Sequence, residues 1–149
     1  MGLSEICNRS VVVAAPKTSV EEAARLMREH HVGSVVVVKE TARGRRPVGI
    51  VTDRDLVVEV IAARVAPATV TVGEIMGPGL VTAPESAEPW DTIRLMRREG
   101  VRRIPVVGDD GCLVGIVTVD DLLEILAEQL DGLARAIAAE QTREARSRG

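Results

Sequence analysis

An internal repeat is the feature that most constrains how this 149-residue chain can fold. Residues 49–56 read GIVTDRDL and residues 115–122 read GIVTVDDL, so six of eight positions are identical at an offset of 66 residues. Residues 25–27 (RLM) recur as residues 94–96 at an offset of 69. The change of offset coincides with a longer loop before Pro47 in the first copy, and a duplicated fold tolerates length changes best in surface loops. The chain therefore predicts two copies of one folding unit.

The hydrophobic pattern of the first copy predicts the order β-α-β-β-α. An apolar run at residues 11–14 predicts a buried strand, and Thr18 or Ser19 can cap the helix that follows and ends near His30. Apolar runs at 35–38 and 48–51 predict two further strands. A second helix is expected from Asp53. Its predicted apolar face consists of Leu56, Val57, Val60 and Ile61.

The second copy repeats this order. It predicts a strand at 80–82, a helix around 90–99, strands at 103–107 and 113–118, and a final helix. We therefore predict an α/β (α+β) fold. Its expected parts are a first repeat at 3–65, a linker at 66–71, a second repeat at 72–130 and a C-terminal helical extension at 131–149.

The final helix is longer than its counterpart in the first copy. Over residues 119–146 it would measure about 40 Å at 1.5 Å per residue, and half of it would protrude beyond the repeat. Its apolar stripe consists of Leu122, Leu126, Leu130, Leu133 and Ile137. Such a stripe needs a partner, so we expect homodimerisation through it. The alternative is that the stripe folds back onto the rest of the chain.

Composition excludes several classes of protein. The net charge is −3 and Trp90 is the only aromatic residue, which disfavours nucleic-acid binding because basic surplus and stacking rings are both missing. No apolar run approaches the roughly 20 residues that span a bilayer, and the first residues do not form a signal peptide. Cys7 and Cys112 do not form a disulfide framework. We expect a soluble, cytoplasmic protein without membrane association.

Two other features favour ordinary structural roles. The basic loop at 43–46 (RGRR) could contact nucleic acid or a partner, but a solvated loop fits the acidic net charge better. His30 and His31 lie at a helix end, where positive charge is favourable, and no cysteine or carboxylate cluster completes a metal site around them. No catalytic motif for nucleophilic, phosphoryl-transfer or metalloprotease chemistry is present. We therefore expect no enzymatic activity and no metal.

The repeated Thr-x-x-Asp motif carries the candidate chemistry. Thr52 and Thr118 each lie where a strand ends and a helix begins, so the hydroxyl and the free amides behind it can hold an anion. Asp55 and Asp121 follow one turn later, and a carboxylate can accept hydrogen bonds from both hydroxyls of a ribose. The alternative is that Thr only caps the helix while Asp complements its dipole. From the residues alone, both interpretations remain open.

The duplicated motifs resemble a tandem pair of cystathionine-β-synthase (CBS) domains, a Bateman module of the stand-alone bacterial type. The resemblance rests on the two GIVTxxDL segments, on residues 101–107 (VRRIPVV), on residues 72–76 (VGEIM) and on the β-α-β-β-α order. It implies two repeats packed by their sheets about a pseudo-twofold axis, with two clefts between them. It also implies that these clefts bind adenine nucleotides or S-adenosylmethionine as regulatory ligands, with no required cofactor.

The resemblance also assigns residues to the clefts. The first nucleotide-binding cleft would contain Ile50, Thr52, Asp55, Leu80, Val101, Arg102, Arg103 and Pro105. The second would contain Val12, Val32, Gly33, Ser34, Val35, Ile116, Thr118 and Asp121. Because only the first set includes arginines, we expect the first cleft to prefer phosphorylated ligands. The second would take a nucleoside-like ligand more weakly, or none.

The expected function is a regulatory or sensory module that binds AMP, ADP, ATP or a similar adenosine-containing ligand and acts on a regulated protein of unknown identity. One alternative is a structural, homodimeric interaction protein with empty clefts. Another is an accessory subunit of an enzyme or transporter, and a weaker one is nucleic-acid binding. Without tyrosine or phenylalanine, an adenine ring in either cleft would have to lie between aliphatic side chains.

Overall fold

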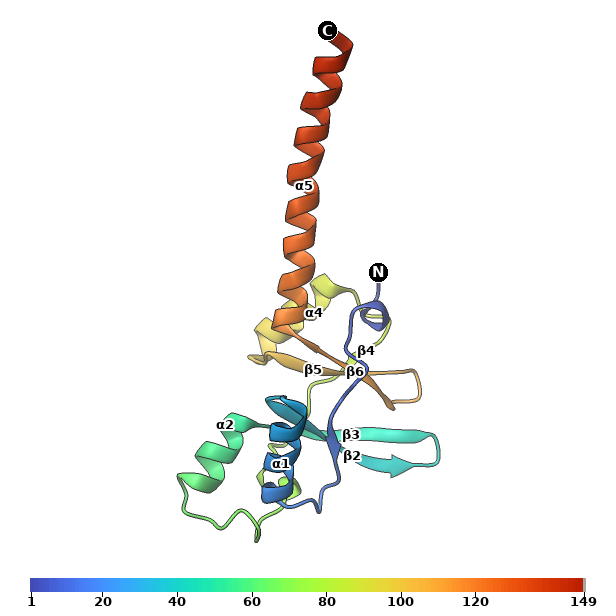
Figure 1. Cartoon of the computed structure of the whole chain (residues 1–149). Coiled ribbons are helices and arrows are strands. Elements are labelled where there is room, and N and C mark those ends of the chain that lie inside the picture. Colours follow the sequence, from blue (N-terminus) through green and yellow to red (C-terminus); the bar gives the residue numbers. More distant parts are fainter. Residues whose placement is uncertain (149) are drawn as a thin grey trace.

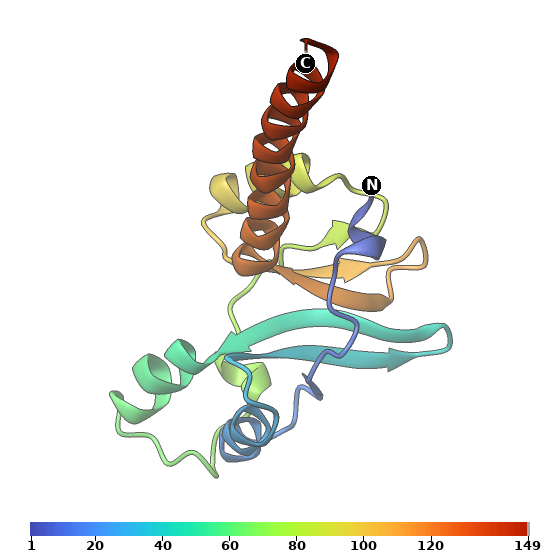
Figure 2. The same ribbon diagram turned by 45° about the horizontal axis from the view of Figure 1, so that its top comes forward.

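The computed structural model describes residues 1–148 and contains two three-stranded sheets stacked on each other (Figure 1, Figure 2). The first repeat consists of β1 (Val13–Ala14), α1 (Val20–His30), β2 (Ser34–Thr41), β3 (Gly44–Thr52), α2 (Asp53–Leu56) and η2 (Val57–Ile61). The second repeat consists of β4 (Ala83–Pro84), α4 (Pro89–Glu99), β5 (Arg103–Val107), β6 (Leu113–Thr118) and α5 (Val119–Arg148). Two short helices, η1 (Leu3–Glu5) and α3 (Val72–Ile75), precede the repeats. The predicted α/β class and the β-α-β-β-α order are confirmed.

Both sheets have the same topology. In each one the short first strand pairs in parallel with the second, which pairs antiparallel with the third. The antiparallel pairing is interrupted by a bulge at Val37/Val38 in the first sheet and at Val106/Val107 in the second, 69 residues apart. Strands β3 and β6 lie against each other where the sheets meet. The duplication in the sequence is therefore a duplication of backbone geometry.

The prediction for the first strand of the second repeat is wrong in position. A strand was expected at 80–82, whereas β4 is Ala83–Pro84. The same shift is smaller in the first repeat, where β1 covers only the end of the apolar run. Apolar residues indicate burial, but a strand also requires backbone pairing with a neighbouring strand. In β5, Val106 pairs with Ala83 and Val107 with Pro84, so only Ala83 and Pro84 form the strand.

The prediction for the helix after Asp53 is partly wrong. Leu56 and Val60 are buried, but Val57 and Ile61 are 53% and 65% exposed. The α-helix ends after four residues and continues as a π-helical segment, in which Ala62 N–H donates to the Val57 carbonyl oxygen at 2.8 Å. The wider π turn displaces side chains from the 3.6-residue period on which the prediction depended.

Helix α5 protrudes from the second repeat, as predicted (Figure 1). Leu122 is its only buried residue among those described, and the side chains from residue 127 onward are exposed. Beyond Leu126, the stripe therefore does not fold back onto the rest of the chain. Gly149, the last residue of the predicted extension, lies outside the described residues. Among residues 1–148, no helix has the length and apolarity needed to cross a membrane.

The segments that precede the repeats pack on the opposite repeat. Leu3 of η1 is fully buried in the core of the second repeat, and its N–H donates to the Ala87 carbonyl oxygen at 2.9 Å. Val70 and Val72, around α3, belong to the core of the first repeat. The N-terminal segment thus begins beside the second sheet and passes to the first (Figure 2). Each core is therefore completed by the segment that precedes the other repeat.

The repeated glycine of the GIVT motif makes this crossing possible. A Cβ on Gly115 would lie 2.7 Å from the Asn8 carbonyl oxygen and 2.7 Å from the Cys7 Sγ atom. A Cβ on Gly49 would lie against Met76, the residue equivalent to Cys7 at an offset of 69. At Gly115 only a residue without a side chain permits this approach, because the atoms met include the Asn8 backbone, whereas at Gly49 they belong to the flexible Met76 side chain.

We predict that Gly115→Ala lowers the free energy of unfolding by about 1–3 kcal/mol, because the added methyl group meets backbone that cannot rotate away. Gly77→Ala is the matched control, since a Cβ there meets nothing within 4 Å, and it should change the value by less than about 0.5 kcal/mol. Urea denaturation measures both. Equal effects of the two variants would contradict the role of Gly115.

The environment of Cys7 gives a second prediction. Burial raises the pKa of the Cys7 thiol, and only the thiolate is nucleophilic. In a Cys112→Ser variant at pH 8, Cys7 should therefore react with a disulfide reagent several times more slowly than free cysteine. The same variant unfolded in urea should react at the normal rate; an equal rate in the folded state would show that Cys7 is not protected.

Candidate functional site

The two Thr-x-x-Asp motifs form the same hydrogen-bonded structure at the starts of α2 and α5. The Thr118 N–H donates to Asp121 Oδ2 at 2.9 Å, and the Asp121 N–H donates to Thr118 Oγ1 at 3.2 Å. The equivalent distances for Thr52 and Asp55 are 2.8 and 3.3 Å. Each pair is a reciprocal capping box. The structure therefore shows that Thr52 and Thr118 cap their helices, and that each aspartate accepts a hydrogen bond from the capping residue's own N–H.

Capping uses only part of each aspartate. A carboxylate has two acceptor oxygens, and the capping box occupies Oδ2 of Asp55 and of Asp121. Within residues 1–148, the other oxygen of each carboxylate has no hydrogen-bond or ion-pair partner. The helix start therefore holds each carboxylate in one orientation and leaves one oxygen available.

A pocket of about 180 Å³ joins the two repeats beside the second motif. Seven of the eight residues predicted for the second cleft line it: Val12, Val32, Gly33, Ser34, Ile116, Thr118 and Asp121. They come from the segment before β1, from the loop before β2 and its first residue, from the end of β6 and from the first turn of α5. The predicted pairing of one repeat's Thr-x-x-Asp with the other repeat's strand entry thus exists as a cavity.

The structure places the eighth residue, Val35, elsewhere. Its side chain is fully buried in the core of the first repeat, whereas the neighbouring Val36 lines the pocket. Successive side chains of a strand point to opposite faces of the sheet. Only one of these two valines can therefore face the cavity, and it is Val36.

The pocket also contains residues that were not predicted for it. Asn8, Ser10 and Val11 reach it because the Asn8 backbone forms two 2.9 Å hydrogen bonds with Ile116, an isolated bridge to the edge of β6. The Ser10 N–H donates to Asn8 Oδ1 at 2.9 Å and turns the chain there. No periodic pattern in residues 8–11 indicates that this segment crosses to the other repeat.

Arg103 corrects the expected difference in charge between the clefts. It was assigned only to the first cleft, but it lines the pocket that contains Thr118 and Asp121. Arg103 lies directly opposite Thr118 in the pairing of β5 with β6, and directly opposite residues point to the same face. The expectation that the second cleft lacks an arginine is therefore wrong.

The Arg103 side chain is held across the boundary between the repeats. Its Nη1 donates to the Gly33 carbonyl oxygen at 3.1 Å, and the Asp53 N–H donates to the same oxygen at 3.0 Å. A Cβ on Gly33 would lie 3.3 Å from Arg103 Nη2 and from Asp53 Oδ2. Since a guanidinium has five donors, Arg103 retains donors for an anion.

The residues predicted for the first cleft are less clearly assembled. Ile50, Thr52, Asp55 and Leu80 are half-buried, Pro105 is buried and Arg102 is exposed. Val101 lines an apolar groove between α4 and α5. Among residues 1–148, the only side-chain hydrogen bonds within this set are those of the Thr52–Asp55 capping box. The clearest candidate site is therefore the pocket at Thr118 and Asp121.

Comparison with known proteins identifies the repeat. A family model described as the CBS domain matches residues 3–62 and again residues 72–128. Uncharacterized protein MK0525 of Methanopyrus kandleri is 38% identical over 125 residues, which cover 84% of this chain but only 62% of that relative. The chain thus spans less than two thirds of the length of this relative.

Solved structures share the fold. Hypoxic Response Protein I, crystallised with two coordinated zinc ions, superposes with a TM-score of 0.74 at 31% identity, covering 83% of this chain and 98% of that one. The CBS domain pair of protein MJ0100, in complex with 5-methylthioadenosine and S-adenosyl-L-methionine, superposes with a TM-score of 0.75 at 26% identity, covering 87% and 98%. In the present chain, residues 1–148 contain no group of three or more His, Cys, Asp or Glu side chains placed to hold a metal ion.

The capping boxes yield a stability prediction. Thr118→Val should lower the free energy of unfolding by about 1 kcal/mol, because the Asp121 N–H loses its acceptor. Thr142→Val removes the hydroxyl that donates to the Ala138 carbonyl oxygen on the exposed part of α5 and should change stability by less than about 0.5 kcal/mol. Thermal or urea unfolding distinguishes them. A neutral Thr118→Val variant would show that the box is not needed for stability.

Proposed function

Because the chain belongs to the CBS-domain family, with one CBS domain in each repeat, we propose that it is a non-catalytic regulatory module whose pocket at Thr118 and Asp121 binds an adenosine-containing ligand. Paired CBS domains are regulatory modules. The observation that carries the proposal is the partly engaged Asp121 carboxylate beside Arg103 in one cavity. We place this activity in the cytoplasm as part of the proposal.

The pocket offers one group for each part of a nucleotide. The free oxygen of Asp121 suits the vicinal hydroxyls of a ribose, and Arg103 suits a phosphate. Branched aliphatic residues from both repeats supply the apolar walls: Val11, Val12, Val32, Val36 and Ile116. A purine ring held here would lie between aliphatic side chains, as the lack of tyrosine and phenylalanine requires.

The size of the cavity limits how the ligand would bind. Pockets for drug-sized ligands usually have volumes of about 300–1,000 Å³, and this one has about 180 Å³. It would enclose only part of a nucleoside and leave the rest of the ligand, with any chain of phosphates, at the opening. Arg103 provides the charge that would hold the first phosphate. AMP, ADP, ATP and S-adenosylmethionine share the enclosed part, so all four belong to the proposed class.

The MJ0100 domain pair supports the ligand class, because its complex contains two adenosine-derived molecules on the same fold. We propose the residues around Thr52 and Asp55 as a second site, since the capping box there has the same geometry and the same free oxygen. Arg103 lines the pocket at Asp121. We therefore propose that this pocket, and not the site at Asp55, prefers phosphorylated ligands.

We further propose that the chain forms a homodimer and acts on a separate regulated protein. The exposed stripe on α5 favours association. It also favours a second candidate function, a structural interaction protein whose clefts remain empty. Mass spectrometry of denatured protein distinguishes the two, because a co-purified adenosine compound is expected only for the regulatory module.

The affinity for the ligand should depend on Asp121 and not on the adjacent Asp120. We predict that AMP, ADP, ATP or S-adenosylmethionine raises the melting temperature, since binding to the native state stabilises it. Asp121→Asn should weaken binding about ten- to a hundredfold in calorimetric titration, the equivalent of about 1.5–3 kcal/mol for a charged hydrogen bond. Asp120→Asn is the matched control, because Asp120 is exposed at the next position and should leave affinity unchanged.

Two outcomes would contradict the proposal. One is a failure of all four compounds to bind the native protein. The other is equal affinity of the two variants for a ligand that does bind, with circular dichroism confirming that both are folded.

A further inference from the structure

Helix α5 carries large apolar side chains in water beyond the second repeat. Leu130, Leu133 and Ile137 are 67%, 65% and 60% exposed. They lie on the part of the helix that extends away from both sheets (Figure 1). The proposed ligand pocket does not use this surface, because all of its lining residues precede Leu122.

The exposed stripe on α5 differs from the predicted one at its first member, because Leu122 is buried and Leu123 is exposed. The exposed stripe consists of Leu123, Leu126, Leu130, Leu133 and Ile137, which follow one another at the alternating intervals of three and four residues that are typical of a coiled coil. A 3.5-residue repeat keeps such a seam facing a single partner helix. The flanking positions hold Ala127, Gln129, Ala134 and Ala136. These side chains permit close approach, but they provide no ion pairs to set the direction of pairing.

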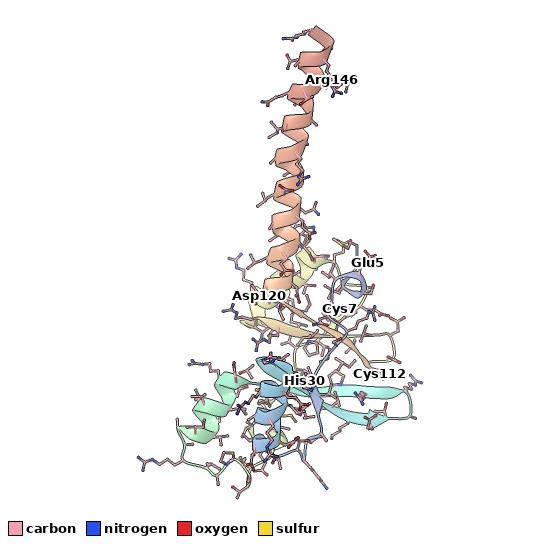
Figure 3. All side chains as sticks on the ribbon, in the orientation of Figure 1. Glu5, Cys7, His30, Cys112, Asp120 and Arg146 are labelled. Atoms are coloured by element: carbon pink, nitrogen blue, oxygen red, sulfur yellow. The ribbon has the colours of Figure 1, made fainter. Side chains whose placement is uncertain are left out.

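The direction is set instead by the charge of the two halves of the helix. Residues 119–133 contain five carboxylates and no basic residue, whereas residues 134–148 contain four arginines and two glutamates. Asp120 lies at the foot of the helix and Arg146 near its tip (Figure 3). A parallel pair would place five carboxylates beside five others. An antiparallel pair places the acidic half beside the basic half, and it also opposes the two helix dipoles.

We infer that two copies of this chain pair through α5 in antiparallel orientation, with the acidic first half of each helix along the basic second half of the other. This inference deepens the homodimer proposed above and does not depend on ligand binding. The stripe consists of the a and d positions of a heptad repeat, and antiparallel packing places each a residue of one helix opposite a d residue of the other. In the register centred between Asp131 and Gly132, Leu126 lies opposite Ile137 of the other copy and Leu130 opposite Leu133 of the other copy.

The foot of the helix extends this surface. An apolar groove of about 300 Å³ lies between α4 and α5, and Ile93, Met96, Leu123 and Leu126 are among its lining residues. Because Leu123 and Leu126 belong to both the groove and the stripe, the apolar surface is continuous. In the inferred register, Glu140 of the other copy lies opposite Leu123. Arg97, which also lines the groove, has no ion-pair partner among residues 1–148 and can meet that carboxylate.

The inferred register also determines the shape of the dimer. Val119 would lie opposite residue 144 of the other copy, so the two helix feet would be about 25 residues apart, roughly 38 Å along the axis at 1.5 Å per residue. A parallel pair would bring the feet to the ordinary helix spacing of about 8–10 Å. The two arrangements thus differ in their overall dimensions without any substitution.

Analytical ultracentrifugation and small-angle scattering of the full chain test the inference. We expect a two-chain mass and an elongated particle with a repeat pair at each end. The dissociation constant should fall as salt is lowered, because screening weakens the attraction between opposite halves. In a parallel dimer, lower salt would increase repulsion and raise the dissociation constant.

Leu130→Gln with Leu133→Gln should weaken the dimer at least tenfold, because it removes two apolar side chains from the stripe without changing the charge of either half. Ala139→Gln with Thr142→Gln changes two positions outside the stripe, also without changing the charge, and should change the constant less than threefold. Both double variants replace exposed residues, so melting temperature and AMP titration should report intact repeats.

Three results would overturn the inference: a monomer at 100 µM, a dimer that tolerates the leucine substitutions, or scattering that places the repeat pairs side by side. Loss of AMP binding with an intact dimer would instead contradict only the ligand proposal.

Discussion

The close contact between each GIVT glycine and the segment that crosses from the other side holds this structure together. Cys7 and Asn8 lie on Gly115, and Met76 lies on Gly49. These contacts bring the N-terminal segment onto the second sheet and the short helix α3 onto the first. Leu3 is then part of the core of the second repeat, and Val72 is part of the core of the first. This exchange ties the two repeats together, because the core of each one contains an apolar side chain from the segment that precedes the other.

The candidate site is a product of the same exchange. Asn8 reaches the edge of β6 through paired backbone hydrogen bonds, and the residues after it form one wall of the pocket. Thr118 and Asp121 of the capping box line the same pocket. A residue that caps a helix is already held in place, so its remaining oxygen is preorganised for a ligand. Structural and binding roles of the motif are therefore compatible.

The sequence was most informative where local chemistry determines geometry. The strands at 103–107 and 113–118 and the helix start at Thr118 were predicted as the structure has them, because hydrophobic period and capping are local signals. Val35 and Val36 could not be separated, since both lie in a continuous valine run with no alternation. The face of Arg103 depends on its register opposite Thr118, a pairing between strands. The π turn at Val57 and the path of residues 8–11 depend on packing across the repeats, which a single sequence does not encode in any simple pattern.

The exchanged segments have a consequence for the ancestry and dissection of such a chain. Neither half contains the piece that closes its own sheet, so one half expressed alone would leave its core open at Gly49 or Gly115. If the two halves were separate chains, each core could be completed only by the N-terminal segment of the other half. The tandem chain is therefore equivalent to a domain-swapped dimer whose two subunits have been joined end to end, with the joint between the two matched CBS domains at residues 63–71.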